Sequence, residues 1–220
     1  MKKYLLIAAC VMMALSVSAQ RARSSSTSTF FSSERSDAPI TFGVTAGLNV
    51  ANMSFEDDGV SISPSSYTSF NVGLTVDIPL LESVYIKSGL FYTGKGCKYE
   101  HKSDDVKLTP SYLEIPILAS YRYDFNETAQ VQFNFGPYFA YGIGGKSKYE
   151  EEKKTYETDF FGSDSDTKRF ESGLQIGAGI TVSQHYYFGV AYQWGLTNVF
   201  DDDDLTVHNK NFMINLGYNF

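Results

Sequence analysis

Charged side chains inside otherwise apolar segments are the first residues of this sequence whose type and spacing could carry chemistry. Those assigned to inward positions are Asp77, Lys87, Glu114, Arg122 and Glu171. In a strand, alternate side chains point to opposite faces, so these charges share an inner face while their apolar neighbours point outward. An isolated buried ion is very costly, so the charges should pair. We predict a structural network of ion pairs and hydrogen bonds, with a proton or ion path, or a catalytic carboxylate pair, as the alternative.

The three histidines are the usual candidates for a general base. His101 and His208 fall in long polar connections, and His185 falls in a tight turn at the opposite end of the strands. None lies on a strand facing a serine or an acidic partner. His208, close to Thr206 and Asp204, is the nearest approach to a catalytic arrangement. We interpret all three as solvated histidines and predict no catalytic residue and no cofactor.

Runs of acidic residues recur in the long connections. They are Glu56–Asp58, Asp104–Asp105, Glu150–Glu152, Asp164 with Asp166, and the run of Asp201, Asp202, Asp203 and Asp204. Clustered carboxylates suit hard cations such as calcium, which makes the last run the candidate metal ligands. It is followed by Leu205 and has no glycine at the turn, so it does not match an EF-hand. We therefore predict a solvated acidic rim and no metal site, with divalent-cation binding as the alternative.

Eight alternating segments must position these residues. Their outward apolar faces span Phe42–Val50, Phe70–Ile78, Val84–Tyr92, Leu113–Phe125, Val131–Ile143, Leu174–Val182, Tyr186–Leu196 and Phe212–Phe220. Each is near the roughly 9–11 residues of a tilted transmembrane strand. Eight is also an even number, as bacterial outer-membrane barrels require.

The connections between the segments alternate in length. Three are tight turns, at Leu80–Ser83, Asn126–Thr128 and Ser183–His185, and four are long and polar, at Ala51–Ser66, Glu100–Thr109, Gly145–Lys168 and Asn198–Asn209. Short turns at one end and long loops at the other are typical of an outer-membrane barrel, whereas a soluble lipocalin-like barrel has no reason for this asymmetry. The sequence thus predicts an all-β protein, an eight-stranded antiparallel transmembrane up-and-down β-barrel over residues 40–220.

The amino-terminal segment has the features of a signal peptide. Lys2 and Lys3 precede an apolar stretch, Leu5–Val17, and small residues end it at Ala19. Residues 1–19 are therefore predicted to be a signal peptide, with lipoprotein processing at Cys10 as the alternative. Residues 20–39 are rich in serine and threonine without periodicity and are predicted to be a flexible periplasmic linker.

The carboxy-terminal strand ends on an aromatic residue. Phe212, Ile214, Leu216, Tyr218 and Phe220 alternate with small or polar residues up to the last position. The last strand of an outer-membrane barrel closes against the first, and aromatic residues lie at the lipid–water boundary. We predict that Tyr218 and Phe220 form the signal for the barrel-assembly machinery, and that the protein is integral to the bacterial outer membrane.

Charge and cysteine content exclude other classes of function. The chain carries a net charge of −7, and loss of Lys2 and Lys3 makes it more acidic. Nucleic-acid binding requires a basic patch, so it is not expected. Cys97 is the single cysteine left after removal of the signal peptide, which excludes an intramolecular disulfide and a cysteine-rich metal site.

Several segments resemble the small outer-membrane β-barrel family of Bacteroidetes that includes PorT-like proteins. They are FGVTAGLNVANM (Phe42–Met53), SYLEIPILASYRY (Ser111–Tyr123), FNFGPYFAYGIGG (Phe133–Gly145) and GLQIGAGITVSQHYYFGVAYQWGLTNV (Gly173–Val199). The resemblance covers Thr41–Phe220 and implies an eight-stranded outer-membrane barrel. Most members have no assigned activity, while PorT itself is tied to type IX secretion.

Three functions are consistent with the sequence. The first is a non-enzymatic envelope scaffold or surface-interaction protein, a porin-like barrel without an open pore, acting through long acidic outer loops. The second is a PorT-like accessory of protein secretion. The third is an outer-membrane enzyme that modifies lipid through His208 or Glu114. The expected partners are outer-membrane lipids and lipopolysaccharide, the barrel-assembly machinery, and secretion-system or envelope proteins.

Overall fold

The computed structural model describes residues 35–57, 60–62, 64–101, 104–126, 128–151, 154–162, 167–200 and 206–220. The predicted signal peptide and most of the predicted linker lie outside these ranges. The strands are β1 (Thr41–Asp57), β2 (Val60–Ile62), β3 (Ser65–Leu81), β4 (Val84–Gly94), β5 (Cys97–His101), β6 (Asp104–Asp124), β7 (Ala129–Glu151), β8 (Lys154–Asp159), β9 (Phe170–Val182), β10 (Tyr186–Gly195) and β11 (Thr206–Asn219). Within the described residues, no helix is long and apolar enough to span a membrane.

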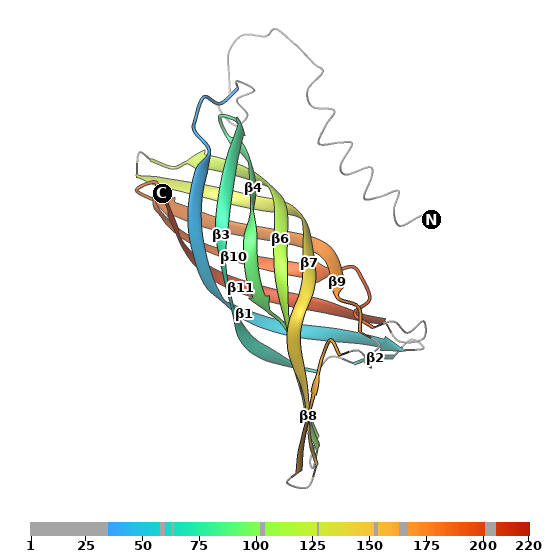
Figure 1. Ribbon diagram of the computed structural model, residues 1–220. Helices are drawn as coiled ribbons and strands as arrows, with labels where there is room; N and C mark the ends of the chain where they lie inside the picture. The colour runs from blue at the N-terminus through green and yellow to red at the C-terminus, as the bar shows by residue number, and fades with distance from the viewer. Residues whose placement is uncertain are drawn as a thin grey trace, which may run out of the picture. The chain divides into compact units, whose positions relative to one another are not determined.

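Eight of these strands close into a barrel (Figure 1). The ring runs β1, β3, β4, β6, β7, β9, β10 and β11, with every neighbouring pair antiparallel. The last strand pairs with the first from Gly43↔Asn219 to Glu56↔Thr206. The Phe220 amide then donates a hydrogen bond of 2.8 Å to the Phe42 carbonyl. The predicted eight-stranded antiparallel up-and-down barrel is confirmed.

Large apolar side chains are exposed on the outer surface of the barrel. Leu74 on β3 and Leu216 on β11 are each 63% exposed. The same sheet buries polar side chains toward the interior, including Asn49 and Gln193, which are 0% exposed. This inverted polarity is that of a barrel whose outer face meets lipid, and it excludes the soluble alternative.

The long connections are largely strand. β1 continues to Asp57, β6 begins at Asp104, and β7 continues to Glu151, where β8 pairs with it. The predicted long, polar loops therefore contain strands that the sequence analysis did not predict. We call the four-stranded extension made by β5, β8, residues 104–109 of β6 and residues 146–151 of β7 the arm; Figure 1 shows it projecting beyond the barrel strands.

An apolar cluster fills the barrel at the end that carries the long connections, which we call the loop end. Its buried members are Met53, Cys97, Tyr112, Tyr138, Ala140, Phe160, Phe161, Val199 and Val207. Phe160 and Phe161 follow β8 directly, and the Phe161 ring meets the Tyr112 ring edge-on at 5.7 Å. Arg169 holds this segment in place by donating hydrogen bonds to the carbonyls of Gly142 (3.0 Å) and Phe161 (2.5 Å). We call this cluster the cap; the opposite end, with the tight turns, is the turn end.

Candidate functional site in the barrel interior

The five charged residues predicted to face inward lie inside the barrel, where the structure divides them into two clusters. The loop-end cluster contains Glu114 of β6 and Glu171 of β9, together with Lys95 between β4 and β5. Lys95 Nζ lies 2.7 Å from Glu171 Oε1 and 3.2 Å from Glu114 Oε2. The side chains of all three are less than 5% exposed. One ammonium group thus balances two carboxylates, and the cluster carries a net charge of −1.

Neutral donors complete the contacts of the loop-end carboxylates. The Tyr138 hydroxyl donates to Glu171 Oε1 (2.7 Å) and Asn209 Nδ2 donates to Glu171 Oε2 (2.6 Å). Gln193 Nε2 donates to Glu114 Oε1 (2.5 Å). Every carboxylate oxygen therefore has a donor or a cation, which is the condition for keeping ionised groups in a low-dielectric interior.

Two aromatic rings flank Lys95. Its Nζ lies 4.4 Å from the centre of the Tyr138 ring and 5.2 Å from that of Tyr112. Both distances are within the range of cation–π attraction, which is stronger for a desolvated cation. The loop-end cluster is thus a closed polar core directly beneath the cap.

The turn-end cluster has the opposite balance. Asp77 of β3 accepts contacts from two cations, Arg122 of β6 and Lys87 of β4. Arg122 Nη2 lies 2.5 Å from Asp77 Oδ2, whereas Lys87 Nζ lies 3.4 Å from Asp77 Oδ1. The Arg122 guanidinium lies 4.1 Å from the centre of the Tyr85 ring, and Lys87 Nζ lies 4.8 Å from that of Tyr187. Two cations on one carboxylate give this cluster a net charge of +1.

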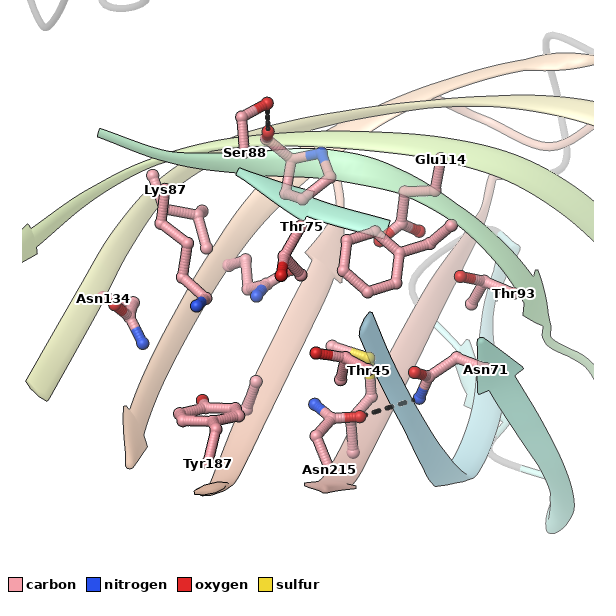
Figure 2. A pocket seen from close by; sticks show the side chains of 16 residues that line it. Thr45, Asn71, Thr75, Lys87, Ser88, Thr93, Glu114, Asn134, Tyr187 and Asn215 are labelled. Atoms are coloured by element: carbon pink, nitrogen blue, oxygen red, sulfur yellow. Dashed lines mark hydrogen bonds between the residues drawn. The ribbon is translucent and has the colours of Figure 1, made fainter. Parts of the chain in front are cut away.

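A small cavity lies inside the barrel, and Figure 2 shows the side chains that line it. Lys87 lines it from the turn-end cluster and Glu114 from the loop-end cluster. The remaining polar contributors are hydroxyl and amide side chains, such as Thr75 and Asn134. Its volume is about 50 Å³, and a buried water needs roughly 10–15 Å³ on this measure. The cavity has room for a few waters or one small ion, not for a nutrient-sized solute.

Sequence reasoning missed Lys95 and the inward aromatic residues. Lys95 lies between Gly94 and Gly96, outside the alternating segments, and Gly96 adopts a φ of 140° that glycine tolerates and other residues rarely adopt. The sequence feature that could have identified Lys95 is a lysine between two glycines at the end of an apolar strand. The Tyr187 ring packs over Gly179 and Gly189, where an added Cβ would lie 2.5 and 2.1 Å from its atoms. Interior glycines therefore mark the places where inward aromatic rings lie.

The histidines take no part in these clusters. His208 Nδ1 lies 3.2 Å from the Thr197 carbonyl oxygen, and His185 Nδ1 lies 2.6 Å from the Ser183 carbonyl oxygen. The side chain of His101 lies outside the described residues. Within the described residues, these two ring nitrogens therefore contact backbone carbonyls rather than a serine hydroxyl or a carboxylate.

Most of the acidic rim lies outside the described residues. This holds for the candidate cation ligands, Asp201, Asp202, Asp203 and Asp204, and for the side chains of the acidic runs at 56–58, 104–105, 150–152, 164 and 166. In the part of the chain that is described, no group of three or more His, Cys, Asp or Glu residues is arranged to hold a metal ion.

The two aromatic residues of the predicted assembly signal lie together at the turn end. The Tyr218 ring centre is 5.7 Å from that of Phe220 and 5.5 Å from that of Tyr186. Phe220 is 72% exposed. These rings lie where aromatic residues form an interfacial girdle in outer-membrane barrels.

Three solved structures of outer-membrane or surface proteins are similar to the chain. The attachment invasion locus protein Ail of Yersinia pestis is 15% identical with a TM-score of 0.44, covering 82% of this chain and 98% of Ail. Neisserial surface protein A (NspA) is 13% identical with a TM-score of 0.45, covering 83% and 100%. The outer membrane protein OprG of Pseudomonas aeruginosa is 12% identical with a TM-score of 0.40, covering 82% and 95%. No curated protein matches the sequence.

A family model decides the assignment. The model described as "Outer membrane protein beta-barrel domain" matches residues 19–201, a range that contains both interior clusters, the arm and every barrel strand except β11. With the closed ring of eight strands and the lipid-facing outer surface, the match identifies the chain as a member of the outer membrane protein beta-barrel domain family, integral to the outer membrane.

Proposed function

We propose that this protein is a non-enzymatic surface-interaction barrel that contacts its partners through the connections of the loop end. In outer-membrane barrels the short turns face the periplasm and the long connections face outward. By that rule the arm and the acidic runs lie outside the cell. Residues 1–19 would direct export, and residues 20–39 would remain in the periplasm.

The observation that carries this proposal is a row of three tyrosines and a valine across the arm. Tyr99, Val106, Tyr149 and Tyr156 are paired in register from β5 to β8. The three tyrosines are 46%, 37% and 54% exposed. Tyrosine supplies large contact area at low conformational cost and is enriched in binding interfaces.

The next row of the arm is basic. Lys98, Lys107 and Lys148 are directly paired across β5, β6 and β7, followed by Glu157 on β8. Like charges directly opposite each other destabilise a sheet. Part of that cost is offset, because Lys148 pairs with Glu157 and because Lys98 and Lys107 lie 5.9 and 4.8 Å from the centre of the Tyr67 ring. Adjacent rows point to opposite faces, so the tyrosine row and the lysine row lie on opposite faces of the arm.

The filled interior supports a surface role rather than solute transport. The cap closes the loop end, and the cavity lined by residues of the two ionic clusters has room for no more than a few waters or one small ion. An eight-stranded barrel has an interior just wide enough for side chains to fill.

The test is affinity capture of the tagged protein from gently solubilised outer membranes, comparing the wild type with a Tyr149→Ser, Tyr156→Ser variant. The matched control is Tyr186→Ser, a 63% exposed tyrosine at the turn end. We expect a stoichiometric partner, or bound lipopolysaccharide, that the arm variant loses and the control keeps. Equal recovery of every partner by wild type and arm variant would refute the proposal.

A PorT-like role in secretion is the alternative suggested by the sequence resemblance. It requires a secretion partner bound at the periplasmic side, through residues 20–39. In the same capture experiment such a partner would survive the arm substitutions and be lost on deletion of residues 22–38.

An enzyme acting on lipid is the third hypothesis. Its candidate residues are His208 and Glu114, but a His208 ring nitrogen lies against a backbone carbonyl, and the Glu114 carboxylate is paired with Lys95 and accepts a hydrogen bond from Gln193. This hypothesis predicts that membranes containing the wild-type protein carry modified lipids and that His208→Ala abolishes the modification. An unchanged lipid profile in that variant removes it.

A further inference from the structure

We infer that the interior cavity binds a small inorganic anion, of the size of chloride, through Lys87. The inference concerns the barrel interior and is independent of the surface role proposed above. It rests on the charge balance of the turn-end cluster, on the incomplete contacts of Lys87, and on the polar lining of the cavity.

Within the turn-end cluster, one positive charge beside the cavity has no carboxylate of its own. Asp77 is shared by two cations, and Arg122 makes the closer contact, 2.5 Å against 3.4 Å for Lys87. The side chains of Lys87 and Asp77 are only 12% and 3% exposed. An uncompensated charge in such surroundings is costly, so a counter-ion beside Lys87 stabilises the folded barrel.

Lys87 also has unused donor capacity. An ammonium group has three N–H donors. The described contacts of Lys87 are the long one to Asp77 and the ring of Tyr187 at 4.8 Å. In Figure 2 its Nζ points into the space lined by Thr75, Asn134 and Tyr187. The ammonium is therefore available to an ion in the cavity.

A second buried group points into the same space. Asn134 is 4% exposed and carries amide N–H donors, whereas its Oδ1, which has no hydrogen-bond partner within the described residues, is an acceptor that would take a water rather than the anion. Figure 2 shows its amide nitrogen on the same side of the cavity as Lys87 Nζ. An amide N–H and the Thr75 hydroxyl are the neutral donors that would complete the shell of a small anion.

The loop-end wall of the cavity, which contains Glu114, does not offer a competing ion site. Glu114 also lines the cavity, but its two oxygens are engaged by Lys95 (3.2 Å) and Gln193 (2.5 Å). A cation bound there would have to displace these contacts. The volume of about 50 Å³ admits a halide and excludes larger organic anions.

The direct test is anomalous diffraction from crystals of the full barrel grown in sodium bromide. We expect a bromide peak in contact with Lys87 Nζ in the wild type. Lys87→Met should lose the peak and still fold, because Asp77 keeps Arg122. The matched control is Lys107→Met on the arm, which should keep the peak. No peak in the wild type, or a peak that persists in Lys87→Met, would overturn the inference.

A solution measurement gives an independent answer. Thermal unfolding of the refolded barrel is followed in sodium chloride and in sodium gluconate at the same ionic strength. An anion that binds only the folded state raises the unfolding midpoint in chloride. We expect that shift in the wild type and in Lys107→Met, and its loss in Lys87→Met. The same midpoint in both salts for the wild type would contradict the proposed site.

Discussion

The two ends of the barrel interior solve the problem of buried charge in different ways. At the loop end, Lys95, Glu114 and Glu171 lie under an apolar cap with every carboxylate oxygen engaged. At the turn end, Lys87 and Arg122 share one carboxylate and keep 12% and 9% of their side chains exposed. A fully buried charge cluster needs a protein partner for every charged atom. A cluster closer to solvent can instead pair one of its cations with an ion from solution.

The comparison also separates the roles of the two ends. The cap and Lys95 belong to the end with the arm, where the barrel continues beyond the lipid-facing belt. The turn end has the closing contact between Phe220 and Phe42 and the girdle around Tyr218. We therefore expect substitutions in the cap and the loop-end cluster to act on stability and on access to the interior, and those of Tyr218 and Phe220 to act on assembly.

The largest effect is expected from Lys95→Met. It leaves two carboxylates buried without a cation, and breaking a buried pair in this way costs about 3–5 kcal/mol. Lys87→Met removes a cation that Arg122 replaces, so it should lower the free energy of unfolding by only about 1 kcal/mol. Denaturant unfolding in lipid bilayers, followed by the fluorescence of Trp194, measures both.

A triple variant sharpens this prediction. Adding Glu114→Gln and Glu171→Gln to Lys95→Met removes the uncompensated charges and should restore part of the lost stability. Equal losses in Lys95→Met and Lys87→Met, or no restoration in the triple variant, would show that the two clusters do not differ in the way described.

The next largest effect is expected from opening the cap with Phe160→Ala. Truncating a buried phenylalanine costs about 3 kcal/mol, at the low end of the range for cores. Burial raises the pKa of the Cys97 thiol from an ordinary 9.0 to about 12. Cys97 lies closer to the arm than Tyr92, the last outward-facing aromatic residue of β4. It belongs to the cap together with Phe160.

The reactivity of this thiol reports on the cap. The thiolate is the reactive form, so a pKa raised from 9.0 to about 12 makes it about a thousandfold scarcer at pH 8. Phe160→Ala should therefore speed labelling of Cys97 by a water-soluble maleimide, located by peptide mass spectrometry. Phe125→Ala, at a 73% exposed position of the turn end, is the control and should not. Unchanged labelling in Phe160→Ala would mean that the cap does not seal Cys97.

A smaller effect on stability is expected from Phe220→Glu. A charge near the membrane interface lowers stability by up to about 1 kcal/mol. Loss of the terminal aromatic residue should nevertheless strongly reduce the amount of protein assembled into the outer membrane. The control is Phe125→Glu, which places the same charge at the same end. The amount of heat-modifiable protein in the outer membrane measures both, and equal amounts of Phe220→Glu and wild type would contradict an assembly signal at the terminus.

The barrel could be predicted from the sequence because each strand has one apolar face that must meet lipid. A period of two in hydrophobicity is therefore visible in segments such as Leu174–Val182 and Phe212–Phe220. The arm could not, because both of its faces are exposed beyond the lipid. In β5 and β8 the alternation places lysine, tyrosine and glutamate side by side, with no hydrophobic contrast to detect.

The interior charges were predicted in type but not in arrangement. Asp77, Glu114 and Arg122 stand out because a charge between apolar neighbours must face inward. Their grouping depends on contacts across the barrel, such as Lys95 to Glu171, 76 residues apart. The cap was missed for the same reason, since Phe160 and Phe161 lie in a connection whose composition is polar, and only its return over the barrel buries them.

The smallest effect is expected from Glu157→Gln on the arm. Glu157 forms solvent-exposed ion pairs with Lys146 and Lys148. The hydrogen bond from Lys146 lowers the pKa of the Glu157 carboxyl group. A lowered pKa contributes stability above the ordinary value of the carboxyl, and that contribution is lost as the pH falls through the lowered value. Exposed ion pairs are strongly screened, so the unfolding midpoint of the barrel should not move. The protection of the β8 amides against hydrogen exchange, relative to their intrinsic exchange rate at the same pH, should instead fall in Glu157→Gln, and in the wild type as the carboxyl is protonated. If Glu157→Gln changed the unfolding midpoint of the barrel as much as Lys95→Met does, exposed and buried charges would contribute equally to stability, contrary to the comparison.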